Sequence, residues 1–112
     1  MIRESHNAVV ARNEDWQGAV ATEPYEVGWA GEAIIFLRAL DVEGTAAGGA
    51  LSVQISPDGM HWVDEGTRLA LPARRDEVTF ARIREFGNWL RVAGTLPKGF
   101  KMRALVTISL KV

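Results

Sequence analysis

Hydrophobic and polar residues alternate along much of the chain with the two-residue period of a β-strand. The segment ALSVQIS (residues 50–56) has three aliphatic side chains on one face and serine or glutamine on the other. The segment KMRALVTISLKV (101–112) has an apolar residue at every second position, and its other face is polar except for Leu105. The segment EAIIFLRALD (32–41) begins with an unbroken apolar run and then alternates, as a buried strand does when it emerges at one end. We therefore predict three long strands.

Five further segments have the β-branched and aromatic composition of strands, and turn residues separate them: AVVAR (8–12), MHWVDE (60–65), TRLALP (67–72), EVTFARI (77–83) and NWLRVAG (88–94). Seven or eight short strands without a convincing helix are typical of an all-β sandwich or barrel. We predict a single antiparallel β-sandwich, jelly-roll-like, over residues 24–112.

Residues 1–23 are predicted to form either an amino-terminal arm or the first strand of the sandwich. They carry short apolar pieces in polar surroundings, and such pieces need a sheet edge to pair with. That edge is either the chain's own or a neighbour's, and strand exchange of the second kind is a route to oligomers.

The segment SPDGMHW (56–62) contains a turn signal directly before a tryptophan. Pro57 presets φ for the first central turn position, Asp58 tolerates the next position, and Gly59 can take the positive φ that returns the chain. We interpret this segment as the corner of a hairpin between residues 50–56 and 60–65. Trp62 is then expected to be a core or cross-strand residue of the returning strand.

The composition narrows the function classes. The 112 residues fit one domain, 47% of them are hydrophobic, and the absence of cysteine excludes disulfides, thiolate metal sites and thiol nucleophiles. The first residues lack the pattern of a signal peptide, and no window approaches the roughly 18 apolar residues of a membrane span. We expect a cytoplasmic or particle-associated protein.

The net charge of −1 gives no general attraction to nucleic acid or to acidic membranes, and we expect neither as a partner. The charge is unevenly distributed along the chain. Residues 1–56 contain three Arg and eight acidic residues, whereas residues 57–112 contain ten Lys or Arg and six acidic residues. This division hints at complementary surfaces.

The sequence offers little for catalysis. A serine, an aspartate and a histidine, Ser56, Asp58 and His61, occur on one tight turn without an evident scaffold, so we interpret them as a solvated turn and expect no enzyme. We predict no cofactor and no metal site. Calcium binding by loop carboxylates at Asp41, Glu43, Asp58 or residues 64–66 stays open as an alternative.

The chain has four tryptophans, more than the core of so small a sandwich commonly holds. If Leu90 and Val92 point inward, alternation sends Trp89 and Arg91 outward. Exposed indoles on a sandwich favour either a protein interface or a sugar-stacking platform. The candidate binding or interface surface comprises Tyr25, Trp29, Asn88, Trp89 and Arg91.

The order of YEVGWAGEAIIFLRAL, ALSVQISPDGMHWVDEG, FARIREFGNWLRVAG and VTISLKV resembles compact jelly-roll or galactose-binding-like β-sandwiches. The resemblance rests on a strand ending in SPDG before Trp62 and on the later strand GNWLRVAG. Such domains occur in phage or virus-like particle accessory proteins and in carbohydrate-binding modules. The absent catalytic set, the possible arm, the surplus aromatic residues and the divided charge favour a non-enzymatic, self-associating structural module, such as a capsid, tail or decoration component. The alternative is a carbohydrate-binding module with Tyr25, Trp29 and Trp89 as stacking groups.

Overall fold

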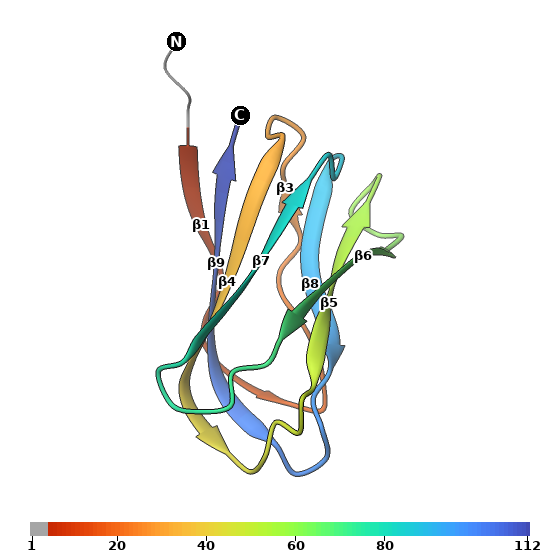
Figure 1. Ribbon diagram of the computed structural model, residues 1–112. Coiled ribbons are helices and arrows are strands. Elements are labelled where there is room, and N and C mark those ends of the chain that lie inside the picture. Colours follow the sequence, from red (N-terminus) through yellow and green to blue (C-terminus); the bar gives the residue numbers. More distant parts are fainter. Residues whose placement is uncertain (1–4) are drawn as a thin grey trace.

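The computed structural model describes residues 5–112 as two antiparallel β-sheets packed face to face (Figure 1). The described residues form strands, turns and loops without a helix, and the predicted all-β sandwich is confirmed. Among these residues there is consequently no apolar helix of the length that a membrane crossing requires.

We call the two layers sheet A and sheet B. Sheet A has the order β1 (Ser5–Gln17), β9 (Lys101–Lys111), β4 (Glu32–Glu43) and β7 (Val78–Arg84). In sheet B, β2 (Ala19–Ala21) and β3 (Tyr25–Glu26) both pair with β8 (Trp89–Thr95), followed by β5 (Ala50–Ser56) and β6 (Val63–Ala70).

The strands pair in a nested order. Strand β1 pairs with β9, β2 and β3 pair with β8, β4 pairs with β7, and β5 pairs with β6. Pairing of β4 with β9 and of β5 with β8 joins these ribbons into the two sheets. The β3–β4, β5–β6 and β7–β8 loops consequently lie at one end of the sandwich, where β1 begins and β9 ends (top of Figure 1). We call this the upper end.

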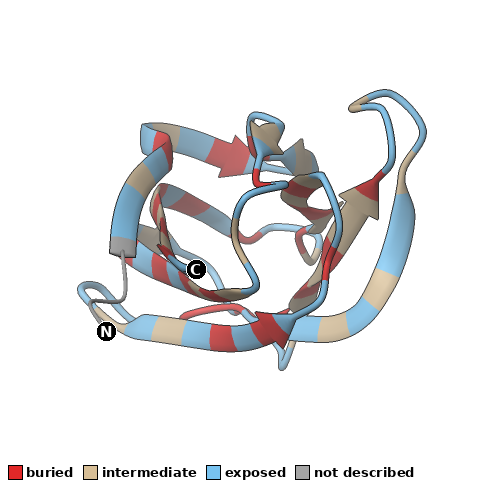
Figure 2. Ribbon diagram, turned by 90° about the horizontal axis from the view of Figure 1, so that it is seen from above, coloured by how far each residue is buried: buried red, intermediate tan, exposed pale blue. Residues whose placement is uncertain are grey.

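Alternate residues of the strands fill the space between the sheets (Figure 2). The predicted alternation is confirmed along β9, where every second residue is buried, and in β5 as far as Val53; Ile55 is only partly buried, and Ser56, expected on the polar face, is buried. Burial of aliphatic side chains in this layer is the main stabilising contribution of the fold. The inward residues of β9 are Met102, Ala104, Val106, Ile108 and Leu110.

Residues 60–65 and 67–72, expected as two strands around a turn at residues 64–66, mostly belong to the single strand β6. Residues 65–67 lie opposite Val53 alone, because Gln54 pairs with Asp64 and Ser52 pairs with Arg68. Gly66, with φ of 112°, forms the bulge. The turn prediction here was wrong because a glycine in a bulge and a glycine in a turn leave the same local signal.

Residues 5–21 are integral strands of the sandwich. Strand β1 pairs with β9 of the same chain along its length, and β2 pairs with β8. The register of β1 shifts on both sides of Ala11, and Asn13 has φ of 53° within this irregular stretch. The first part of the predicted arm, residues 1–4, lies outside the described residues.

Two neighbours on β4 provide a test of the strand's two faces. Leu37 is fully buried, whereas Phe36 points away from the core and is 36% exposed. We expect Leu37→Ala to lower the free energy of unfolding by about 2–5 kcal/mol through lost burial and cavity formation. The control Phe36→Ala should lower the free energy of unfolding by less than half of that amount. Urea unfolding at low protein concentration measures both variants. Equal losses would contradict the assignment of faces.

Candidate interaction surfaces

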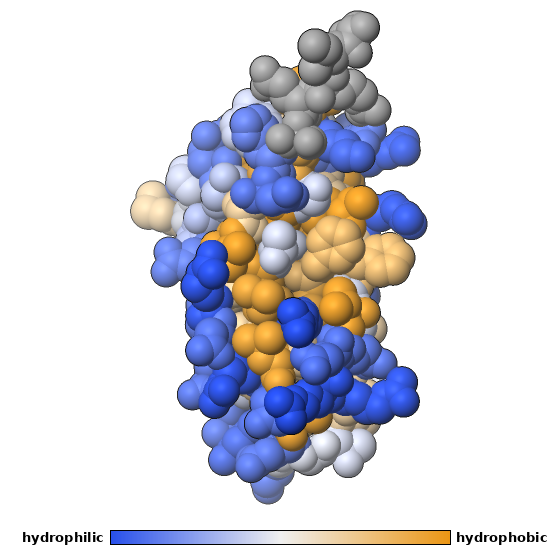
Figure 3. Space-filling model, turned by 90° about the vertical axis from the view of Figure 1, so that its left-hand side faces the viewer, coloured by the Kyte–Doolittle hydropathy of each residue, from blue (hydrophilic) through white to orange (hydrophobic). Residues whose placement is uncertain are grey.

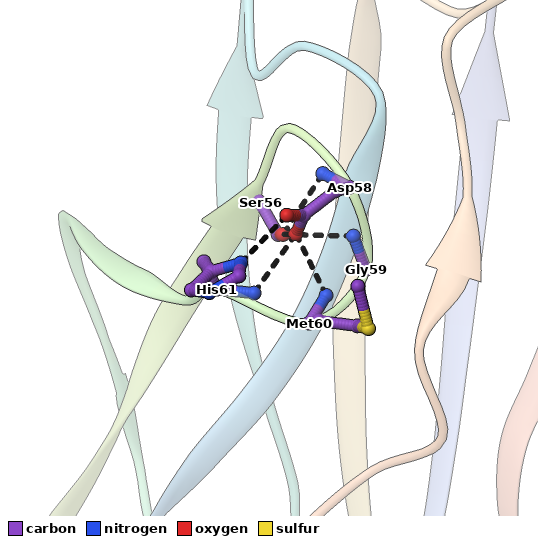
Figure 4. A network of polar contacts seen from close by, with 5 residues as sticks. All are labelled: Ser56, Asp58, Gly59, Met60 and His61. Atoms are coloured by element: carbon purple, nitrogen blue, oxygen red, sulfur yellow. Dashed lines mark hydrogen bonds and ion pairs between the residues drawn. The ribbon is translucent and has the colours of Figure 1, made fainter.

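Side-chain hydrogen bonds close the loop of residues 57–62 between β5 and β6 (Figure 4). The Ser56 hydroxyl oxygen accepts the backbone N–H groups of Asp58 and Gly59 at 3.2 and 2.8 Å. One carboxylate oxygen of Asp58 accepts the N–H groups of Met60 and His61 at 2.8 and 2.9 Å. The pKa of Asp58 is held well below its usual range, first by the His61 backbone N–H and then by that of Met60.

Asp58 lies between the other two members of the nominal serine, aspartate and histidine set. The Ser56 hydroxyl donates to one Asp58 oxygen at 3.0 Å, and the His61 ring nitrogen Nδ1 lies 2.6 Å from the other. A catalytic triad places the histidine between the serine and the acid, so that the ring can take the serine proton. The arrangement seen here holds a loop together instead.

The same loop covers Trp89 on the outer face of sheet B. Gly59 has the predicted positive φ, 81°, and a Cβ at this position would lie 3.2 Å from the Trp89 ring. Glycine therefore serves two needs here: the backbone conformation and the close approach to the indole. Trp89 is half-buried as a result.

A chain of side-chain contacts crosses sheet B beside this loop. The Gln54 amide donates to Asp64 at 2.9 Å and accepts from Arg91 Nε at 2.8 Å. The Arg91 guanidinium lies 4.4 Å from the centroid of the Trp62 ring, in cation–π contact. Trp62 thus precedes β6 and stacks on the outer face of sheet B, so it is not a core residue, and its contact with Arg91 reaches across to β8. The loop is longer than the four-residue turn assumed, which moves Trp62 out of the strand.

The five predicted surface residues lie in different environments. Leu90 and Val92 are fully buried, so Trp89 and Arg91 point outward as expected, but Tyr25 pairs opposite Leu90 and packs against the core. Trp29, in the β3–β4 loop, is 40% exposed, and its ring meets that of His6 edge-on at 4.9 Å.

Asn88, the remaining member of the set, is exposed in the β7–β8 loop. Its backbone carbonyl accepts the N–H of Val27 at 2.6 Å. This bond ties the β7–β8 loop to the start of the β3–β4 loop, so Asn88 holds two upper-end loops together through its main chain.

The loop carboxylates considered for calcium are dispersed: Asp41 and Glu43 on β4, Asp58 in the upper-end loop, and Asp64 on β6. In the part of the chain that the structure describes, no three His, Asp or Glu side chains are grouped as metal ligands.

The outer face of sheet A exposes large hydrophobic side chains that we did not single out from the sequence. Phe36 pairs with Phe80 on one side and with Thr107 on the other, and Thr107 pairs with Val9. One row therefore crosses all four strands. The two phenylalanine ring centroids are 6.4 Å apart.

Neighbouring rows extend this surface, which we call the apolar belt. Its exposed members are Val9, Phe36, Val78 and Phe80, at 42%, 36%, 49% and 52%. Ile34 and Leu105 are half-buried members on the adjoining rows. Figure 3 shows the side of the molecule on which hydrophobic residues form a band between charged ones. The sequence signal was an apolar residue at an outward position in each of four strands, but only the register brings these residues side by side.

Charged residues border the belt at both ends. Basic groups predominate at the upper end, where Arg82, Arg84 and Lys111 surround Glu32. A depression of about 260 Å³ lies among these residues.

At the opposite end, which we call the lower end, a larger depression of about 380 Å³ has an excess of acidic groups. Asp15, Asp41 and Glu43 line it together with Lys101 and Arg103. The Arg103 guanidinium lies 3.5 Å from the Asp15 carboxylate. The two ends of the outer face of sheet A thus carry opposite charge excess.

Comparison with known proteins shows similarity in fold. No protein-family model and no curated protein matches the sequence. Among solved structures, the SPBc2 prophage-derived protein YomS is similar over 100% of this chain and 96% of its own, with a TM-score of 0.57 and 9% identity. A chain in the structure of infectious bursal disease virus, Gx strain, is similar over 98% of this chain and 32% of its own, with a TM-score of 0.50 and 12% identity.

A matched pair of glycines tests how the loop covers Trp89. Gly59 and Gly87 have φ of 81° and 80°, but a Cβ at Gly87 would meet no atom within 4 Å. We expect Gly87→Ala to cost about 1 kcal/mol of unfolding free energy from backbone strain. Gly59→Ala should cost about 1–3 kcal/mol more through its contact with the ring. Urea unfolding measures both, and equal losses would contradict the covering of Trp89.

The lowered pKa of Asp58 predicts a pH-dependent stability. A carboxyl group whose pKa is lower in the folded state stabilises that state above its unfolded pKa of about 3.9, and the contribution disappears as the pH falls through the folded value. Wild type should therefore melt at a higher temperature than Asp58→Asn from about pH 5 to about pH 8. The difference should narrow as the pH falls below about 4. A difference independent of pH would exclude this role of the Asp58 charge.

Proposed function

We propose that this protein is a non-enzymatic structural module that self-associates as a component of a larger particle. The observation that carries the proposal is the apolar belt. Contiguous apolar surface with a polar rim marks interaction sites, whereas single exposed hydrophobic residues need no explanation. The belt has four exposed hydrophobic side chains on three strands of sheet A, with Val9 separated from Phe36 by Thr107, and charged residues border it. Covering it by a second copy removes this surface from water.

The geometry of the β5–β6 loop supports a function without catalysis. The serine, aspartate and histidine that could have formed a catalytic set are joined through Asp58. Their hydrogen bonds go mainly to the loop's own backbone N–H groups. We therefore assign these three residues to the architecture of the upper end.

The nested strand order supports a jelly-roll assignment. When β2 and β3 are counted as one interrupted edge strand, the sandwich has four strand positions in each sheet, and the first strand pairs with the last. Jelly rolls of eight strands in two sheets occur in viral capsid and lectin domains. The prophage-derived protein and the virus chain share this chain's overall fold. We extend the particle setting from them to this chain as part of the proposal.

Association through the face of sheet A fits better than addition of strands to its β1 edge. The two register shifts in β1 interrupt its regular hydrogen-bonding edge. Bulges of this kind are a device by which edge strands avoid pairing with another chain. The face has no comparable protection, since Phe80 and Val78 stand exposed beside Phe36.

Light scattering with substitutions in and outside the belt tests the proposal. The wild-type protein should have a mass of two or more times the 12.3 kDa of one chain. The double variant Phe36→Ser/Phe80→Ser should shift to monomer, because it removes the central aromatic pair of the belt. The control Met60→Ser/Val63→Ser removes two hydrophobic residues of the β5–β6 hairpin that are more exposed than Phe36 and Phe80, and it should leave the assembly intact. A monomeric wild type at high protein concentration would refute self-association.

A further inference from the structure

Strand β7 forms one edge of sheet A, and every second residue directs its backbone polar groups away from the sheet. Just before the strand, the Glu77 carbonyl accepts the Ala39 N–H at 3.1 Å. Just after it, the Glu85 N–H donates to the Gly31 carbonyl at 3.1 Å. Both bonds continue the register of β4 and β7, so the odd-numbered residues of β7 face β4. The even-numbered residues face the open edge with their N–H and C=O groups: Val78, Phe80, Arg82 and Arg84.

The other three edges of the described sandwich are interrupted. The register of β1 shifts twice, β6 contains the bulge at Gly66, and the third edge is divided between the short strands β2 and β3, with Pro24 between them. Such irregularities keep an edge from pairing with another chain. Strand β7 pairs with β4 over seven residues without a register shift, and no strand of residues 5–112 pairs with its other side. It is thus the edge best suited to accept a further strand.

Charge selects the kind of strand that this edge accepts. Arg82 and Arg84 are exposed at alternate positions of β7, and Lys111 adds a third positive charge to the upper depression beside the single acid Glu32. The ion pairs within residues 5–112 use other basic groups: Arg38, His61, Arg74 and Arg103. A second copy of β7 brings two more arginines to the junction, which disfavours it. Acidic side chains opposite Arg82 and Arg84 form ion pairs instead.

The upper part of β7 is the accessible part of the edge. Toward the lower end, the Thr79 hydroxyl donates to the carbonyl of Ala70, the last residue of β6, at 2.6 Å. Phe80, Arg82 and Arg84 lie beyond this contact, and all three side chains are exposed. The Arg82 guanidinium lies 5.1 Å from the centroid of the Phe80 ring. A guanidinium stacked on a ring keeps the N–H donors in its own plane for a carboxylate.

We propose that this edge binds an extended acidic segment of another protein, which adds to sheet A as a further antiparallel strand. The main chain of the segment bonds to the edge groups of Phe80, Arg82 and Arg84, and two acidic side chains at alternate positions pair with the guanidinium groups. In this mode of recognition, main-chain hydrogen bonds give affinity and alternate side chains give specificity. The inference goes beyond the proposed self-association, because edge groups point sideways in the plane of the sheet and stay open when its face is covered.

Peptide binding tests the pairing. The probe is a short fluorescein-labelled peptide in which glutamate and valine alternate, and fluorescence anisotropy measures its binding to the full chain. In an antiparallel pair, the residues opposite Arg82 and Arg84 direct their own N–H groups toward β7, whereas their neighbours direct them away. We therefore expect N-methylation of the glutamates to abolish binding and N-methylation of the valines to preserve it. A peptide with lysine in place of glutamate should not bind.

Matched variants of the protein locate the site. Arg82→Ser/Arg84→Ser should weaken binding about tenfold, because it removes two exposed ion pairs. The control Arg74→Ser/Arg75→Ser makes the same change in net charge in the β6–β7 loop and should leave the affinity within about twofold of the wild-type value.

The outcomes separate this inference from the proposed function. A wild-type protein that does not bind the glutamate peptide, equal binding of the lysine peptide, or equal losses in the two variants overturns the inference and leaves self-association standing. A fall in the mass of the assembly when the peptide is added shows that a second copy occupies the edge, which also overturns it. Binding that requires unmethylated glutamates together with Arg82 and Arg84 supports the inference, whether the protein is associated or monomeric in light scattering.

Discussion

The antiparallel pairing of β9 with β1 on one side and β4 on the other is the constraint on which the structure depends. It brings the last strand of the chain between the first strand and a middle one, and it sets which residues face the core. A slip of one residue would turn the buried side of β9, from Met102 to Leu110, toward solvent. The same register aligns Val9, Thr107 and Phe36 on the opposite side. The core and the apolar belt are therefore two consequences of one pairing.

The outer faces of the two sheets differ in a way that bears on function. On sheet B, hydrogen bonds and a cation–π contact connect Asp64, Gln54, Arg91 and Trp62, and the loop around Gly59 covers Trp89. Large side chains on this face are thus satisfied within the chain. On sheet A, Phe36 and Phe80 contact each other and the Arg82 guanidinium lies 5.1 Å from the centroid of the Phe80 ring, but both rings remain partly exposed. This asymmetry is why the proposed assembly uses sheet A.

The surplus of tryptophan has a structural explanation in this chain. Trp16 is buried in the core, Trp89 supports the β5–β6 loop, and Trp62 stacks with Arg91. Trp29 keeps the greatest exposure and meets His6 at the upper end. Of the two indoles that suggested a ligand platform in the sequence, Trp89 therefore supports a loop, and Trp29 remains exposed.

The sequence by itself determined the long strands β4, β5 and β9, because alternation is a local property that each strand carries independently of its partners. It located β5 at the bounds observed, β9 within one residue and β4 within two, and it placed Leu90 and Val92 inward. Only the tertiary structure decided which outward residues meet. The row from Val9 to Phe80 joins positions some seventy residues apart, and the environment of Trp62 depends on Arg91 from another strand. Such contacts follow from long-range register, which no local period contains.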